Sequence, residues 1–164
     1  MHPALQALVI CAAAVAAEGA LAGPGVRARF AELRQPPHSP SLTVWFIIGA
    51  AYYVTCFVLL RRLLASTLPS DPHRIAFFLL LALMAANAVW GWLFFRRKNL
   101  RASFLAFLPY GFIGIALGAV LVVVDRTSAV LLAPYLLYLG YAAWWSYRLW
   151  ALNRPLSANG FTGA

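Results

Sequence analysis

The stretch SFLAFLPYGFIGIALGAVLVVV, residues 103–124, contains no charged side chain. As an α-helix rising 1.5 Å per residue it would be about 33 Å long, which matches the hydrocarbon thickness of a bilayer. In the whole chain 63% of the residues are hydrophobic and 10% are charged, against about 25% charged in a soluble domain. So few polar side chains could not cover a soluble fold of this size. The stretch therefore predicts a transmembrane helix.

Four further stretches are apolar and long enough to cross a bilayer: about residues 3–22, 41–60, 75–95 and 128–150. Three of the four connections are short, so consecutive helices should be antiparallel neighbours. We therefore expect an all-α membrane protein, with one five-transmembrane-helix bundle over residues 1–155 and a disordered tail over 156–164. The long first loop should contain a short amphipathic helix near residues 27–33, followed by an extended proline-rich segment.

The first apolar stretch has a second interpretation, as a cleaved signal peptide. Ala20-Leu21-Ala22 resembles a cleavage site, but no Lys or Arg precedes the stretch, and signal peptides start with basic residues. This favours a retained membrane helix.

The net charge of +9 comes from short basic clusters between the apolar stretches, such as Arg61-Arg62 and Arg96-Arg97-Lys98. Bases in this position are typical of topology determinants and of contacts to lipid headgroups, so we expect no nucleic-acid partner. Nine Lys and Arg side chains fall on the side of the first loop, the third loop and the C-terminus, and four fall on the other side. The imbalance predicts a multi-pass protein with its C-terminus in the cytoplasm and its N-terminus outside.

Motifs in the last three spans go beyond a generic membrane bundle. The segment from Ala86 to Phe95 resembles the Phe-Asn-x-x-Trp-x-x-x-Phe-Phe signature of the translocator protein family, also called tryptophan-rich sensory protein or TspO/MBR. The segment 132–138, after Asp125, is similar to the family's Pro-Tyr-Leu entry to the last helix, and 152–155 to its Leu-Asn-x-Pro close. In the first half, 19–21, 33–36 and 52–53 match weaker family patterns. The resemblance covers about residues 17–155.

The chain also departs from the family pattern. Trp45 is the only tryptophan near the first loop, where the family has several, and Gly49 stands at the second-helix tryptophan position. Tyr138 replaces the tryptophan after Pro-Tyr-Leu, Trp145-Ser146 stand where the family has Leu-Asn, and Trp92 replaces a proline. The chain thus resembles a divergent member.

The resemblance implies a pocket beneath the first loop that binds tetrapyrroles such as protoporphyrin or, in some members, sterols, in a bundle that is often a homodimer. The residues themselves are consistent with such a pocket, because aromatic and small side chains recur on one stripe of the third span and one of the fifth. We expect a ligand-binding site formed by Tyr53, Asn87, Trp90, Phe94, Tyr135, Tyr138 and Trp145. The competing interpretation is that these aromatics pack helices or lie at the membrane interface, and that Asn87 joins helices by a hydrogen bond.

Three other features remain open. Glu18 lies near the end of the first span, where an ionisable side chain is either functional or reaches the interface or stays protonated. Asp125 with Arg126 is expected to cap the turn before the last span. Gly111, Gly114 and Gly118 form a small-residue face that serves internal packing, for which the alanines of the first span offer a partner, or dimerisation.

No residue pattern specifies a catalytic set, a metal site or a cofactor, and Cys11 and Cys56 lie in apolar stretches without a ligand spacing. The only cofactor-like group that the resemblance implies is a porphyrin or haem-type ligand. The leading hypothesis is therefore a membrane binding or sensory protein for a tetrapyrrole or similar flat lipophile. The alternatives are a light-dependent porphyrin-degrading enzyme, disfavoured by the glycine at position 49, and a structural or assembly subunit without ligand.

Overall fold

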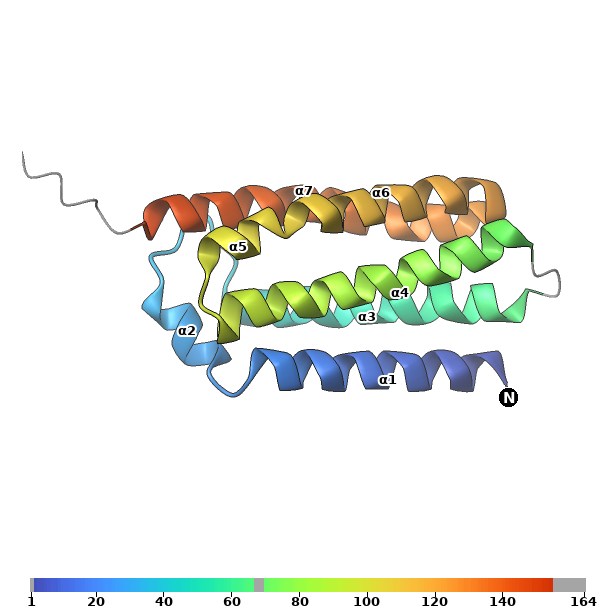
Figure 1. The fold of residues 1–164 in the computed structure, drawn as a ribbon, viewed down its shortest axis with the longest axis horizontal. Helices are drawn as coiled ribbons and strands as arrows, with labels where there is room; N and C mark the ends of the chain where they lie inside the picture. Colours follow the sequence, from blue (N-terminus) through green and yellow to red (C-terminus); the bar gives the residue numbers. More distant parts are fainter. Residues whose placement is uncertain (1, 67–69, 155–164) are drawn as a thin grey trace, which may run out of the picture.

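The structure, a computed structural model, describes residues 2–66 and 70–154. Five long helices run along the long axis of the molecule, and a short helix lies across one end (Figure 1). They are α1 (Pro3–Ala22), the short α2 (Val26–Glu32), α3 (Leu42–Ala65), α4 (Asp71–Gly91) with a π-helical turn η1 (Trp92–Arg96), α6 (Phe107–Val124) preceded by α5 (Leu100–Leu105), and α7 (Arg126–Leu152). Each of the five long segments is long and apolar enough to cross a membrane. The predicted all-α, five-span architecture is confirmed.

Local sequence explains where several helices begin and end. The Ser41 hydroxyl accepts a hydrogen bond from the Val44 N–H (3.4 Å) and caps α3, and the Asn99 side chain does the same for the Ala102 N–H (2.9 Å) at the start of α5. Gly23 ends α1 with φ +77°, a backbone conformation that glycine adopts without a steric penalty. These residues fix the entry and exit of the spans.

The structure differs from the expected spans most clearly in α3, in α4 and in the first loop. Helix α3 continues beyond Arg61-Arg62 to Ala65, because arginine is a good helix former and does not end a helix by itself. Helix α4 begins four residues early, at Asp71, since Pro72 is favoured in a first helical turn. The proline-rich part of the first loop is not extended throughout: His38 has φ +60°, and the Ser39 N–H bonds the Pro36 carbonyl in a turn. The tail 156–164 lies outside the described residues.

The five spans pack in a ring with the order α1, α3, α7, α6, α4 and back to α1, and α3 also contacts α4 across it. Consecutive spans contact each other, α3 and α4 across the ring and the other pairs as neighbours in it, as expected for antiparallel helices in one bundle. The contacts of α1 with α4 and of α3 with α7 close the bundle. Their side chains therefore face one another around a common centre.

The small-residue face of α6 packs inside the bundle against α7. A Cβ atom added at Gly114 would lie 3.0 Å from Leu136 Cδ2, and one added at Gly118 would lie 3.1 Å from Leu136 Cδ1. The expected partner, the alanine face of the first span, is wrong for these two glycines, because α1 packs on α3 and α4 instead. Leucine side chains fill the space that the glycines leave.

The outer surface of the bundle is apolar. Large hydrophobic side chains such as Phe112, Val123 and Leu137 are 74%, 80% and 79% exposed. In water such a surface would drive aggregation, whereas in a bilayer it matches the acyl chains. The exposed face of these helices is therefore the lipid-facing surface.

Candidate functional site: an aromatic cavity inside the bundle

A cavity of about 640 Å³ lies between α1, α3, α4 and α7. Its wall is mostly apolar and aromatic, and α2 contributes Val26 and Phe30 at the end where the first loop crosses the bundle. Cavities that bind drug-sized molecules have volumes of about 300–1,000 Å³ and similar apolar walls with a few polar groups. The cavity is therefore large enough to enclose an organic ligand.

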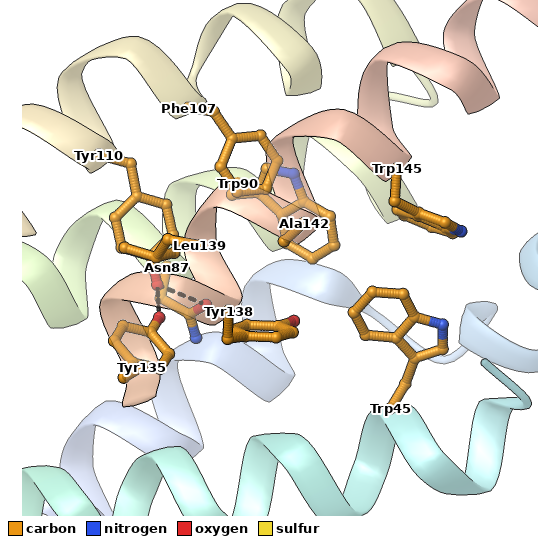
Figure 2. Close-up of a pocket in the computed structure, with 10 residues that line it drawn as sticks. All are labelled: Trp45, Asn87, Trp90, Phe107, Tyr110, Tyr135, Tyr138, Leu139, Ala142 and Trp145. Atoms are coloured by element: carbon orange, nitrogen blue, oxygen red, sulfur yellow. Dashed lines mark hydrogen bonds between the residues drawn. The ribbon is translucent and has the colours of Figure 1, made fainter. Parts of the chain in front are cut away.

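Aromatic rings from α3 and α7 face each other at this end of the cavity. The centroid of Trp45 lies 4.7 Å from that of Trp145 and 6.1 Å from that of Tyr138. Figure 2 shows Trp45 rising from α3 toward the other two rings. The Trp145 indole is held in place because its Nε1 donates a hydrogen bond to Ser39 Oγ (2.7 Å). The rings provide flat apolar faces for a planar molecule.

A second group of rings comes from α4 and the π-helical turn that follows it. Trp90 stacks on Phe94 with centroids 5.1 Å apart, and the ring centroid of Phe107, from α6, lies 5.9 Å from that of Trp90. The π-helical turn shifts the register after Gly91, and turns of this kind are frequent at functional sites. Beside these rings a small hollow of about 30 Å³, drawn in Figure 2, adjoins the main cavity. That volume is enough to hold water.

A chain of polar side chains crosses the bundle next to the aromatic rings. Tyr53 Oη and Asn87 Nδ2 both donate to Glu18 Oε2, at 2.5 and 2.9 Å. Tyr110 Oη donates to Asn87 Oδ1 (3.1 Å), and the Tyr110 and Tyr135 hydroxyls are hydrogen-bonded to each other. Part of the chain is visible as dashed lines in Figure 2. The five residues come from all five spans, so the network ties the whole ring together.

The first loop is anchored over the cavity by a reciprocal amide pair. Arg34 N–H donates to Asn153 Oδ1, and Asn153 Nδ2 donates to the Arg34 carbonyl, both at 3.0 Å. These bonds join the end of the loop helix to the end of α7. Together with the bond from Trp145 to Ser39 they hold the loop against the bundle.

The seven residues predicted to bind a ligand all line the cavity wall: Tyr53, Asn87, Trp90, Phe94, Tyr135, Tyr138 and Trp145. Their role in binding stays a prediction. Trp45 and Phe30 also line the cavity, and Tyr110 lines the small hollow beside it, but the sequence does not predict these three as site residues. Glu18, for which the sequence allows a functional or a purely structural role, lines the cavity as well. Trp45 had a signal, as the one tryptophan beside the first loop; for Phe30 and Tyr110 no local pattern distinguishes a cavity residue from a packing residue.

At the other end of the bundle, Asp125 begins α7 but its charged partner is not Arg126. The Arg62 guanidinium donates to both carboxylate oxygens, from Nε (2.7 Å) and Nη2 (2.9 Å), and Ser128 Oγ donates to Oδ2 (2.6 Å). These bonds hold the pKa of Asp125 well below its usual range, with Arg62 as the main cause. Arg62 therefore ties the end of α3 to the turn before α7.

The fold and the cavity define a multi-pass integral membrane protein with an aromatic chamber inside a five-helix bundle. Residues 7–151 match the sequence model of the TspO/MBR family, so the chain belongs to this family. Comparison with curated protein sequences found no significant match.

Proposed function

We propose that the protein is a binding or sensory membrane protein of the TspO type that holds a tetrapyrrole or a similar flat lipophilic molecule in the cavity. The observation that carries the proposal is the 640 Å³ cavity with aromatic rings from α3, α4, η1 and α7 in its wall. An assembly subunit that only paired helices would need no such chamber. Membership of the TspO/MBR family supports the proposal, since ligand binding of this kind is what the resemblance implies.

The test is a titration of the purified protein with protoporphyrin, followed by tryptophan fluorescence. Three of the six tryptophans line the cavity, so a bound porphyrin should quench the emission in a saturable way. Trp90→Ala and Tyr138→Ala should each weaken binding about tenfold, because each removes a ring from the wall. Trp144→Ala is the control, since Trp144 is 48% exposed on the outer face. Quenching without saturation would remove porphyrins as ligands.

We further propose that the protein binds its ligand without breaking it down. Gly49 lines the cavity at the position where the family resemblance expects a tryptophan, and an added Cβ there meets no atom within 4 Å. The cavity therefore has one ring fewer beside a bound porphyrin than a family member with that tryptophan. Under light, the porphyrin absorption band should decay no faster with the protein than with the Trp90→Ala variant. Faster decay with repeated turnover would favour the enzyme instead.

A further inference from the structure

Glu18 differs from the other three acidic residues of the chain. Each of the other three, Glu32, Asp71 and Asp125, forms a salt bridge with an Arg or Lys side chain. Glu18 forms none within residues 2–66 and 70–154, and it lines the large cavity. The one carboxyl group that faces the chamber is thus also the one without a cationic partner in the described part of the chain.

The hydrogen-bond partners of Glu18 place its carboxyl group deep in the bundle. At 1.5 Å per residue, Tyr53 lies about 16 Å along α3 from its first residue, Leu42. Asn87 lies about 14 Å from Arg96, the last residue of the span formed by α4 and η1. Side chains on a helix tilt toward its N-terminus, which carries the Glu18 carboxyl away from the nearby end of α1. The carboxyl group therefore does not reach the interface, and a polar group at this depth is costly unless it has partners.

The network fixes the direction of hydrogen bonding toward Glu18. Asn87 uses its oxygen to accept from Tyr110 and its NH₂ to donate to Glu18, and Tyr53 donates to the same Oε2. Because both of these hydrogen bonds end on Oε2, Glu18 is the final acceptor of the chain. Its second oxygen, Oε1, receives no hydrogen bond from any residue in the described ranges, and it can accept one more donor.

We infer that Glu18 selects ligands that point a nitrogen-bound hydrogen at this oxygen, such as a pyrrole N–H or, more strongly, a protonated nitrogen. The inference rests on the proposed function, because it names the polar contact made inside the same cavity. The tyrosine and tryptophan rings in the cavity wall favour a cationic nitrogen as well, through their negative faces. A flat lipophile without such a donor fills the cavity but leaves the carboxylate unsatisfied.

The experiment compares two fluorescent probes of nearly equal shape, 1-pyrenemethylamine, which is protonated at neutral pH, and 1-methylpyrene, which is neutral and has no donor. Both are titrated against the full chain in zwitterionic nanodiscs, with empty nanodiscs subtracted. A hydrogen bond to a charged group contributes enough to expect at least a tenfold preference for the amine. Glu18→Gln should reduce the preference to about threefold or less and leave 1-methylpyrene affinity unchanged, whereas Glu18→Asp should keep most of it.

Glu32→Gln is the matched control, because Glu32 pairs with Arg29 and Lys98 outside the cavity. It should keep the wild-type preference. Equal affinity of the wild-type protein for the two probes would overturn the inference whatever the variants do, and so would a preference that survives Glu18→Gln. If neither probe nor protoporphyrin binds the wild-type protein saturably, the cavity is not a binding site and the proposed function itself fails. Binding of 1-methylpyrene alone keeps that function and removes only the role of Glu18.

Discussion

Asn87 is the residue at which the polar network of the bundle branches. From α4 it donates to Glu18 on α1 and accepts from Tyr110 on α6. Hydrogen bonds between membrane helices contribute on average only about 0.6 kcal/mol each, because the unfolded state in lipid also finds partners. The main effect of Asn87 is therefore to orient the side chains around the cavity, with a modest gain in stability.

Replacing Asn87 by Ala should lower the free energy of unfolding by about 1–2 kcal/mol, because two interhelical bonds are lost and Tyr110 and Glu18 each lose a partner. The measurement is reversible unfolding in mixed micelles. Thr55→Ala serves as control: among the described residues the Thr55 hydroxyl bonds to the Ala51 carbonyl of its own helix alone, so this change should cost no more than about 0.5 kcal/mol. Equal losses in the two variants would mean that the network does not join the helices.

Asp125 combines two roles that substitutions can separate. Asn at this position keeps the cap on the Ser128 N–H but loses the ion pair with Arg62, whereas Ala loses both. We expect thermal stability in the order wild type, Asp125→Asn, Asp125→Ala, with about 1 kcal/mol between the last two for the missing cap.

The ion pair should also make stability depend on pH. Because the pKa of Asp125 is lowered in the folded protein, its contribution is complete above the unfolded value of about 3.9 and declines as the pH falls below it. The melting-temperature difference between wild type and Asp125→Asn should therefore be constant from pH 7 to 5 and narrow below pH 4. A difference that does not change down to pH 2 would contradict the role of Arg62.

At the scale of helices, much was predictable because hydropathy and capping are local properties. Ser41 begins α3, Gly23 ends α1, and the loop helix α2 falls within one residue of its expected place. The π-helical turn after Gly91 was not predictable, since no local signal distinguishes it from a continued α-helix. The sequence does not predict the extension of α3 past Arg61, because a pair of basic residues is typical of the end of a span; in the structure Arg62 lies within the helix and has a partner at Asp125.

The contact between α6 and α7 leads to a prediction about two glycines one turn apart. An added Cβ at Gly114 lies 3.0 and 3.3 Å from leucine side chains of α7, whereas one at Gly111 meets nothing within 4 Å. Gly114→Leu should therefore destabilise the bundle by about 1–3 kcal/mol through overpacking, and Gly111→Leu should change stability by about 0.5 kcal/mol or less. The measurement is the thermal unfolding of both variants, in which Gly114→Leu should lose more stability than Gly111→Leu. A larger loss of stability for Gly111→Leu would show that Gly111 meets a partner, such as a second copy of the chain.

At the scale of the whole molecule, the cavity depends on pairings that are distant in sequence. Glu18 and Asn87 are 69 positions apart, and Trp45 and Trp145 are 100 apart, so no periodicity within one span could show that they meet. The sequence predicts one stripe of aromatic and small side chains on the third span and one on the fifth, and in the structure residues of both stripes, on α4 with η1 and on α7, line the same cavity. Which polar group completes the site required the arrangement of all five helices. Dimerisation stays a prediction that follows from the family resemblance.

The molecule has two ends of unequal charge, and this predicts its orientation in the membrane. The start of α1 lies at one end of the bundle, with the end of α3 and the start of α4, and the loop helix α2 lies at the other (Figure 1). Of the 13 Lys and Arg side chains, nine belong to the α2 end, which should therefore face the cytoplasm.

A membrane-impermeant maleimide added to intact cells should label a Ser70→Cys variant and leave Ser41→Cys unlabelled until the cells are permeabilised. Both serines are exposed and lie at opposite ends, whereas Cys11 and Cys56 are buried and should give little background. The reverse pattern would place the first loop, and with it the end of the cavity that α2 lines, on the outer side of the membrane.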